Sequence, residues 1–315
     1  MPVEKERNSD IETLLRRSYR LFESGDFDEA QHLLDEAHAS DFEDLEVRSA
    51  MRACGFWRQR IAHVGVLSGD GARGDYLRRQ WKVFVDRYRP GLEHPFDDGL
   101  SRLRTWVLGQ ALGHYRNQAS AGGDPDALLQ AARCLKALGR YEECINTLED
   151  ALRRSGDTDA RVLSELADTY ALVGETDPAK VLMREALYIE ASAVDPDEIG
   201  SPLFRRLIDR VTEYVPTEDP GFLEWIPVYG SLWGVLNVKR ELSPVEYGKL
   251  KQSIYALKSE IADGDEQGCL KPRLINRYIR LIDHFQTTGA NRSATDEALM
   301  EIKLLSPTLY RNFFE

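Results

Sequence analysis

The sequence is poor in cysteine: its 315 residues include four, at positions 54, 134, 144 and 269, and none stands in a C-x-x-C pair. Four scattered thiols in a chain of this length exclude a disulfide framework. Long apolar runs are also missing, because the longest stretch without a charged residue, Trp225–Val238, has 14 residues and contains a proline and two glycines. A membrane-spanning helix needs about 20 apolar residues, so no transmembrane segment is predicted.

Basic residues are fewer than acidic ones, 41 Lys and Arg against 53 Asp and Glu, which gives a net charge of −12. A negative chain repels nucleic acid on average, so nucleic acid is a disfavoured partner. The N-terminus, residues 1–7, is charged and lacks the apolar segment of a secretory signal. Together with the unpaired thiols, this favours a cytoplasmic protein.

Catalytic and metal-binding motifs are absent as well. The six histidines show no metal-ligand spacing, and there is no G-x-S-x-G, S-x-x-K or GK[ST] pattern. Gly69–Gly74 formally reads G-x-G-x-x-G, but a dinucleotide site needs this motif between a strand and a helix. Its surroundings read as helical, so we predict an inter-helix loop over Ser68–Gly74. No enzyme activity, cofactor or metal is expected.

The chain does have a helical pattern that recurs. Apolar residues follow the i, i+3, i+4, i+7 spacing of an amphipathic helix, a glycine ends that helix, and a second helix with a small residue at a fixed position follows. The glycines are Gly25, Gly139 and Gly174, the last two being 35 residues apart. The small residues Ala30, Cys144 and Ala179 are predicted at the crossing of two helices, opposite Ala132 and Ala167. Cys144 is therefore expected to be a buried, structural thiol.

These residues resemble the tetratricopeptide repeat, a helix-turn-helix module of about 34 residues. The resemblance covers residues 11–44, 125–158 and 160–193. It implies an all-α solenoid, a right-handed superhelix of helical hairpins, whose concave face binds a protein or peptide. Carried over to this sequence, that face would present Tyr19, Phe22, Arg133, Lys136, Arg161 and Asp168. The three cations among them would suit an acidic segment.

Residues 45–120 also carry apolar helical stripes and are predicted to be degenerate or elongated repeats. Pro216 and Pro220 then break the helical pattern, so a domain boundary is predicted there. The solenoid would occupy residues 1–215 and a C-terminal helical domain residues 216–315. In that domain Ser243 is followed by a proline and opens a helix, as expected of an N-cap.

Charge is distributed unevenly along the chain. The net charge is −8 over residues 1–44, +6 over residues 45–120 and −10 over residues 121–315. Arginines account for most of the central excess, and two interpretations stay open: they pair with the acidic flanks, or they form a basic groove for an acidic ligand or nucleic acid. The arginines concerned include Arg48, Arg52, Arg58, Arg60, Arg73, Arg78, Arg79, Arg87 and Arg89.

The segment Phe222–Leu236 is rich in aromatic residues and is interrupted by proline and glycine. Two roles are open for it: capping the apolar end of the solenoid, or docking a partner through Trp225, Tyr229 and Trp233. The sequence thus predicts a non-enzymatic scaffold or adaptor that binds protein partners. The alternatives are a regulator that uses the arginine cluster, and an assembly component of an envelope or motor complex that docks through Trp225–Leu236. Self-association is left open.

Overall fold

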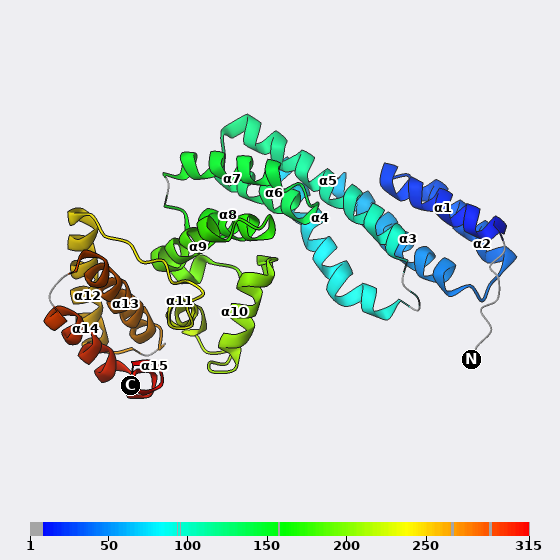
Figure 1. Cartoon of the computed structure of the whole chain (residues 1–315). Helices are drawn as coiled ribbons and strands as arrows, with labels where there is room; N and C mark the ends of the chain where they lie inside the picture. The colour runs from blue at the N-terminus through cyan, green and yellow to red at the C-terminus, as the bar shows by residue number, and fades with distance from the viewer. Residues whose placement is uncertain are drawn as a thin grey trace, which may run out of the picture. The chain divides into compact units, whose positions relative to one another are not determined.

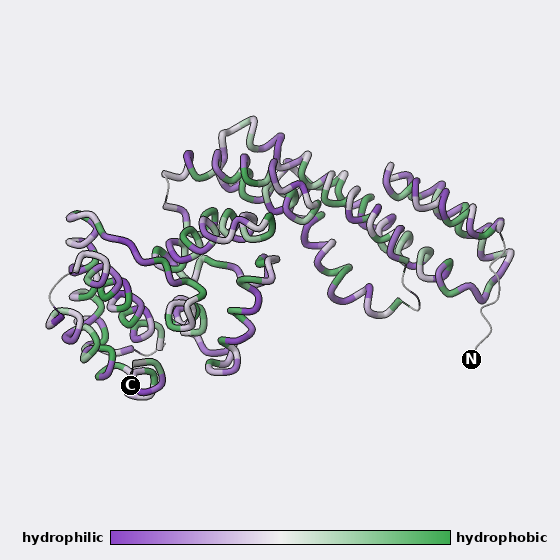
Figure 2. Tube along the Cα trace, viewed as in Figure 1, coloured by the Kyte–Doolittle hydropathy of each residue, from purple (hydrophilic) through white to green (hydrophobic). Residues whose placement is uncertain are grey.

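The computed structural model of the chain describes residues 9–92, 94, 96–156, 158–265, 268–289 and 292–314. These residues form fifteen α-helices joined by turns and loops, with no β-strand among them (Figure 1). Hydrophobic and hydrophilic residues are interspersed along the helices, as amphipathic helices require (Figure 2). The predicted all-α class is confirmed. The chain divides into two compact units, Met1–Thr147 and Leu148–Glu315.

The first unit begins with a helical hairpin. Gly25 turns the chain with a φ of +83°, a conformation that glycine adopts without strain. A side chain at this position would also collide with the ring of Trp106. Asp26 then accepts a hydrogen bond from the backbone amide of Glu29 and so caps the second helix. The two helices are α1 (Ser9–Ser24) and α2 (Phe27–Ser40).

Longer helices follow in the region predicted to hold degenerate repeats. Among them α5 is central to the unit, because α1, α4 and α6 all pack against it. A π-turn over Phe84–Tyr88 and a 3-10 turn over Arg89–Gly91 extend the end of α4. The helices are α3 (Leu45–Val64), α4 (Asp70–Val83), α5 (Asp97–Gly122), α6 (Pro125–Ala137) and α7 (Tyr141–Ser155), the last of which spans the division between the units.

The glycine-rich segment predicted as an inter-helix loop begins α4 instead, and that part of the prediction is wrong. Gly69, with a φ of +87°, precedes the helix, and Asp70 is its first residue. A Cβ added to Gly74 would lie 2.7 Å from the ring of Tyr115 on α5. The Tyr115 hydroxyl donates a hydrogen bond to Asp75 at 2.7 Å, which holds that ring in place. The motif therefore allows α4 and α5 to pack closely.

After the end of α7, the second unit continues with the hairpin of α8 and α9, which leads through two 3-10 turns into α10 and α11. Residues from all four helices form one hydrophobic core, for example Ala167, Met183, Phe204 and Ile226. Tight packing at the α8–α9 crossing needs small side chains, and Ala167 is completely buried in it. The helices are α8 (Ala160–Leu172), α9 (Thr176–Glu190), α10 (Pro202–Thr212) and α11 (Phe222–Leu232).

Four more helices complete this unit around a second core, which includes Leu250, Ile275 and Ile302. Both α12 and α14 pack against α13. Ser243 caps α12 as predicted: its hydroxyl accepts from the amide of Glu246, and the Glu246 carboxylate accepts from the amide of Ser243. The helices are α12 (Pro244–Asp263), α13 (Leu270–Thr288), α14 (Arg292–Leu305) and α15 (Pro307–Phe314).

Helix α11 contributes to both cores, because Phe222 and Ile226 belong to the first and Val228 belongs to the second. The boundary predicted at residues 215 and 216 therefore falls inside the second compact unit. Pro216 and Pro220 do interrupt the helix between α10 and α11. A break in a helix does not divide a core when the apolar residues on both sides still pack together.

Candidate functional site

Tyr19 and Phe22, predicted to line a concave groove, are buried in the core of the first unit. The ring of Phe22 stacks on Phe27 with centroids 5.7 Å apart, and the Tyr19 hydroxyl donates to the carboxylate of Glu46 at 2.8 Å. The ring of Phe96, at the start of α5, lies 6.4 Å from that of Tyr19. Because α5 packs against α1, it covers the face that a simple array of hairpins would leave open.

The three predicted cations are divided between the units. Arg133 and Lys136 lie on α6, the first half-buried and the second buried. Arg161 is exposed at the start of α8 and binds Asp159 at 2.7 Å. Burial opposes ionisation of Asp159, but the hydrogen bonds and charge of Arg161 outweigh it and lower the pKa of that carboxyl. One of the cations is thus buried, a second is half-buried, and the third neutralises a neighbouring carboxylate.

Asp168, also predicted to face a partner, is buried in α8 and has a structural role. Its carboxylate accepts hydrogen bonds from the backbone amides of Gly200 and Ser201 at 2.8 and 2.9 Å. Ser201 is the N-cap residue of α10. Amides at a helix start lack partners within the helix, and a carboxylate both satisfies them and interacts favourably with the helix dipole. Asp168 therefore fixes the start of α10 against α8.

The central arginines show a mixture of contacts. Arg58 binds Asp28 in the acidic N-terminal segment at 2.5 Å, as the pairing interpretation predicted. Arg52 instead donates to the backbone carbonyl of Gly91 at 2.9 Å. The guanidinium of Arg60 lies over the ring of Phe56 and also donates to an amide oxygen of α4. These arginines connect helices within the first unit, and they do so mostly through neutral groups.

The aromatic residues predicted as a docking surface form a row along α11. Trp225, Tyr229 and Trp233 are spaced four residues apart, so they lie on one side of the helix. Ring centroids are 5.7 Å apart for the first pair and 4.9 Å apart for the second. Tyr214, just after α10, contacts Tyr229 and Trp233 at 5.3 and 5.4 Å. We call these four residues the aromatic ladder.

The aromatic ladder is half-buried. Trp225 and Tyr229 pack against both cores and Trp233 packs against the first, while Tyr214 is 51% exposed. The guanidinium of Arg210 lies 4.1 Å from the centre of the Trp233 ring, within cation–π distance. Trp, Tyr and Arg are the residues that dominate binding hot spots. The ladder therefore stabilises the core with its inner edges and presents aromatic and cationic groups at its outer edge.

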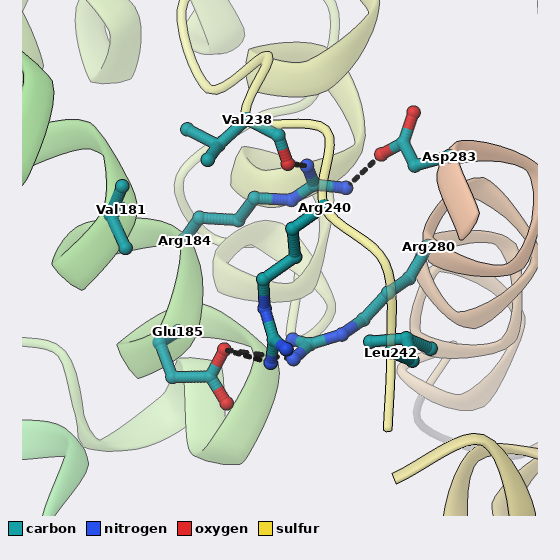
Figure 3. A pocket seen from close by; sticks show the side chains of 8 residues that line it. All are labelled: Val181, Arg184, Glu185, Val238, Arg240, Leu242, Arg280 and Asp283. Carbon is teal, nitrogen blue, oxygen red and sulfur yellow. Dashed lines mark hydrogen bonds and ion pairs between the residues drawn. The ribbon is translucent and has the colours of Figure 1, made fainter. Parts of the chain in front are cut away.

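Two ion pairs join α9 to α13 in the second unit (Figure 3). Arg184 on α9 donates to Asp283 on α13 and to the backbone carbonyl of Val238. Arg280 on α13 donates to Glu185 on α9 at 2.9 Å. Each helix thus supplies a cation to the carboxylate of the other. Sequence reasoning missed these pairs because their partners are separated by 99 and 95 residues.

These ion pairs surround a cavity of about 30 Å³, which has room for about one or two water molecules. Arg240 also lines this cavity, and its guanidinium donates a hydrogen bond to the Glu246 carboxylate at 2.5 Å. Each arginine around the cavity thus has a carboxylate beside it, and Figure 3 shows Asp283 beside Arg184 and Glu185 beside Arg240 and Arg280. Anionic ligands would have to compete with these carboxylates, so the arrangement favours a structural joint between α9 and α13.

Tyr188 on α9 strengthens the same joint. The guanidinium groups of Arg277 and Arg280, on α13, each lie 3.7 Å from the centre of its ring. Burial lowers the pKa of Arg277. Its Nε atom donates to Ser253 on α12 at 3.3 Å, and its Nη1 atom has no hydrogen-bond partner among the described residues. The tyrosine ring therefore supplies much of the stabilisation of a buried cation.

A larger hollow of about 400 Å³ opens between α12 and α14, and we call it the α12–α14 groove. Lys258 on α12 and Glu301 on α14 bridge it at 2.6 Å. Sequence reasoning missed this groove, although Tyr255 on α12 is a large aromatic residue outside the buried stripe of its helix. The groove is lined by Tyr247, Lys251, Ile254, Tyr255, Lys258, Tyr278, Leu281, Phe285, Ala294, Glu297, Ala298 and Glu301.

The hairpin of α6 and α7 has the geometry that the repeat pattern predicted. Gly139 lies between the helices with a φ of +74°, and Cys144 is buried, its thiol donating to the backbone carbonyl of Ala132 at 3.2 Å. Residues 125–158, which include this hairpin, match the family model of the tetratricopeptide repeat. The chain contains a tetratricopeptide repeat. No curated protein matches the chain.

The matched tetratricopeptide repeat is the second of the three hairpins that the sequence pattern predicted. The other two segments also fold as helical hairpins, α1–α2 and α8–α9. Tetratricopeptide repeats are protein-interaction modules, so the match indicates a role in protein binding. None of the described helices combines the length and the apolar character needed to cross a membrane.

Groups that could support metal or thiol chemistry are sparse in the part of the chain that the structure describes. No cluster of three or more His, Cys, Asp or Glu side chains is placed there to hold a metal ion. Burial raises the pKa of Cys54 to about 12, so this thiol stays protonated at neutral pH. Cys134 and Cys144 are also buried. These three thiols pack as small apolar groups.

Proposed function

We propose that this protein is a non-enzymatic scaffold that binds a protein partner, and that the aromatic ladder is its main contact. The observation that carries the proposal is the part-buried row of Trp225, Tyr229 and Trp233, joined by the half-exposed Tyr214 and bordered by Arg210. Large, rigid aromatic side chains lose little conformational entropy on binding, and they bury a large area. The tetratricopeptide repeat supports the general role.

The ladder is a better candidate than the residues predicted from the repeat pattern. Tyr19, Phe22 and Asp168 are buried, so a partner could reach them only after unfolding. Lys136 is buried and Arg133 is half-buried in the first unit. By contrast, Tyr214 exposes half of its surface beside the rings of Tyr229 and Trp233, and Arg210 lies over the Trp233 ring.

The chemistry of the ladder specifies the kind of segment that would bind. An apolar side chain would cover Tyr214 and Trp233, and burying such a surface is favourable by about 25 cal/mol per Å². A carboxylate beside it would meet Arg210, whose guanidinium lies over the Trp233 ring. The expected partner is therefore a protein segment with an apolar residue next to an acidic one.

The test uses the full chain as bait in an extract of its source cells. Chains that co-purify are identified, and the affinity of each purified partner is measured by calorimetry. Tyr214→Ala and Arg210→Ala should each weaken binding by about tenfold or more, as hot-spot substitutions do. Arg205→Ala is the matched control, because Arg205 is exposed on another side of α10, five residues before Arg210.

Circular dichroism must show that each variant melts like the unchanged protein, so that a loss of binding reports the contact itself. A partner that binds the Tyr214→Ala and Arg210→Ala variants with unchanged affinity would exclude the ladder as the contact. If no chain is recovered by the unchanged bait under any condition, the scaffold role itself is contradicted.

A further inference from the structure

The two sides of the α12–α14 groove carry opposite charges. The charged residues that line the groove are Lys251 and Lys258 on α12 and Glu297 and Glu301 on α14. Lys258 and Glu301 already bind one another across the groove at 2.6 Å. Lys251 and Glu297 are exposed, one on each side. The groove therefore has a basic rim and an acidic rim.

The two helices that border the groove also expose large apolar side chains that do not belong to either core. Tyr255 on α12 is 79% exposed, and on α14 Met300 and Leu304 are 57% and 73% exposed. Between the rims, Ile254, Leu281 and other apolar residues line the groove. An apolar groove with exposed apolar side chains beside it is typical of an interaction surface.

We propose that this face binds the same face of a second copy of the chain. Charge complementarity selects this occupant, because a two-fold axis along the groove places α12 of each copy over α14 of the other. Each basic rim then meets an acidic rim, and the surface is complementary to itself, as an isologous interface requires. A two-fold axis across the groove would instead put lysines against lysines.

The dimer also explains the exposure of Tyr255. In the face-to-face arrangement, Tyr255 of one copy lies over the second copy, where its ring can enter the groove of about 400 Å³. The ring then fills a hollow that a single chain leaves open to solvent. Two such rings, related by the axis, enter the interface from opposite sides.

Reversal of one rim charge tests the proposal. Sedimentation velocity of the full chain over a wide concentration range should show a monomer–dimer equilibrium, weakened by added salt. Lys251→Glu places two acidic rims together and should raise the dissociation constant by about tenfold or more, and Glu297→Lys should do the same. An equimolar mixture of the two variants should dimerise again, because each rim then meets its opposite.

Matched controls lie on the same helices. Lys249 is exposed two residues before Lys251, and Asp296 is exposed one residue before Glu297. At about 3.6 residues per helical turn, both side chains point away from the groove. Lys249→Glu and Asp296→Lys should leave the dissociation constant unchanged. A chain that stays monomeric at every concentration would overturn the proposal. So would a dimer that Lys251→Glu does not weaken, or a mixture of the two variants that does not recover.

Discussion

The buried carboxylate of Glu224 on α11 accepts two hydrogen bonds from the guanidinium of Arg273 on α13, at 3.0 and 2.5 Å. The same hydrogen bonds raise the pKa of Arg273. Glu224→Ala removes the carboxylate that pairs with this cation. We expect Glu224→Ala to lower the free energy of unfolding by about 2–4 kcal/mol. This is somewhat less than the loss on breaking a fully buried ion pair, because Arg273 is about a third exposed. Urea unfolding measures it.

A double-mutant cycle separates this pair from other effects of the substitution. Arg273→Met keeps most of the side-chain volume, and the double variant Glu224→Ala, Arg273→Met should be more stable than Glu224→Ala alone. Strictly additive losses would mean that the two groups do not interact. The free energies must be compared at the same pH and salt concentration.

Two glycines of α4 provide a second test. A Cβ at Gly74 would lie 2.7 Å from the rigid ring of Tyr115, whereas one at Gly71 would meet the flexible end of Gln118. Alanine favours a helix over glycine by about 1 kcal/mol, but overpacking costs about 1–3 kcal/mol. Gly74→Ala should therefore destabilise the protein, and Gly71→Ala should change stability much less. Thermal melts of both variants measure the difference.

Gly113→Ala is the reference for these variants, because a Cβ at Gly113 on α5 would meet nothing within 4 Å. This substitution should stabilise by up to about 1 kcal/mol. Equal effects of alanine at positions 74 and 113 would contradict the close packing of α4 on α5.

The α8–α9 crossing can be tested at Ala167, which is completely buried and shares its core with Ala179. A leucine there has no space, so Ala167→Leu should lower the free energy of unfolding by about 1–3 kcal/mol. Ala137→Leu, at the exposed end of α6, should have little effect. An unchanged unfolding midpoint for Ala167→Leu would contradict the tight crossing.

Local features were predictable from the sequence because short-range rules determine them. Gly25 and Gly139 end helices with positive φ, Ser243 forms the predicted cap, and Cys144 is buried at a helix crossing. Each follows from spacing and backbone preference within one hairpin. The same rules indicated helices throughout residues 45–120, although they did not give the length of α5.

Features that depend on distant residues were not predictable. The repeat pattern placed Tyr19 on an open face, but α5 begins some 78 residues later and covers it. The ion pair of Arg184 with Asp283 and the groove between α12 and α14 likewise depend on how helices far apart in sequence come together. Amphipathic spacing shows which side of a helix is buried, but it does not show against which helix.

The cap of α12 makes stability depend on pH. The Glu246 carboxylate accepts hydrogen bonds from Arg240 and from the amide of Ser243, which lowers its pKa from 4.5 to about 2. A carboxyl whose pKa is lower in the folded state stabilises the fold above pH 4.5, and this contribution is lost as the pH falls from 4.5 to about 2. Glu246→Gln should therefore be less stable than the unchanged protein at pH 7, and the two should converge near pH 2. Urea unfolding at a series of pH values measures both.

Glu241→Gln, at an exposed position nearby, should keep the pH dependence of the unchanged protein. A stability difference between Glu246→Gln and the unchanged protein that stays constant from pH 7 to pH 2 would contradict the role of the Glu246 carboxylate.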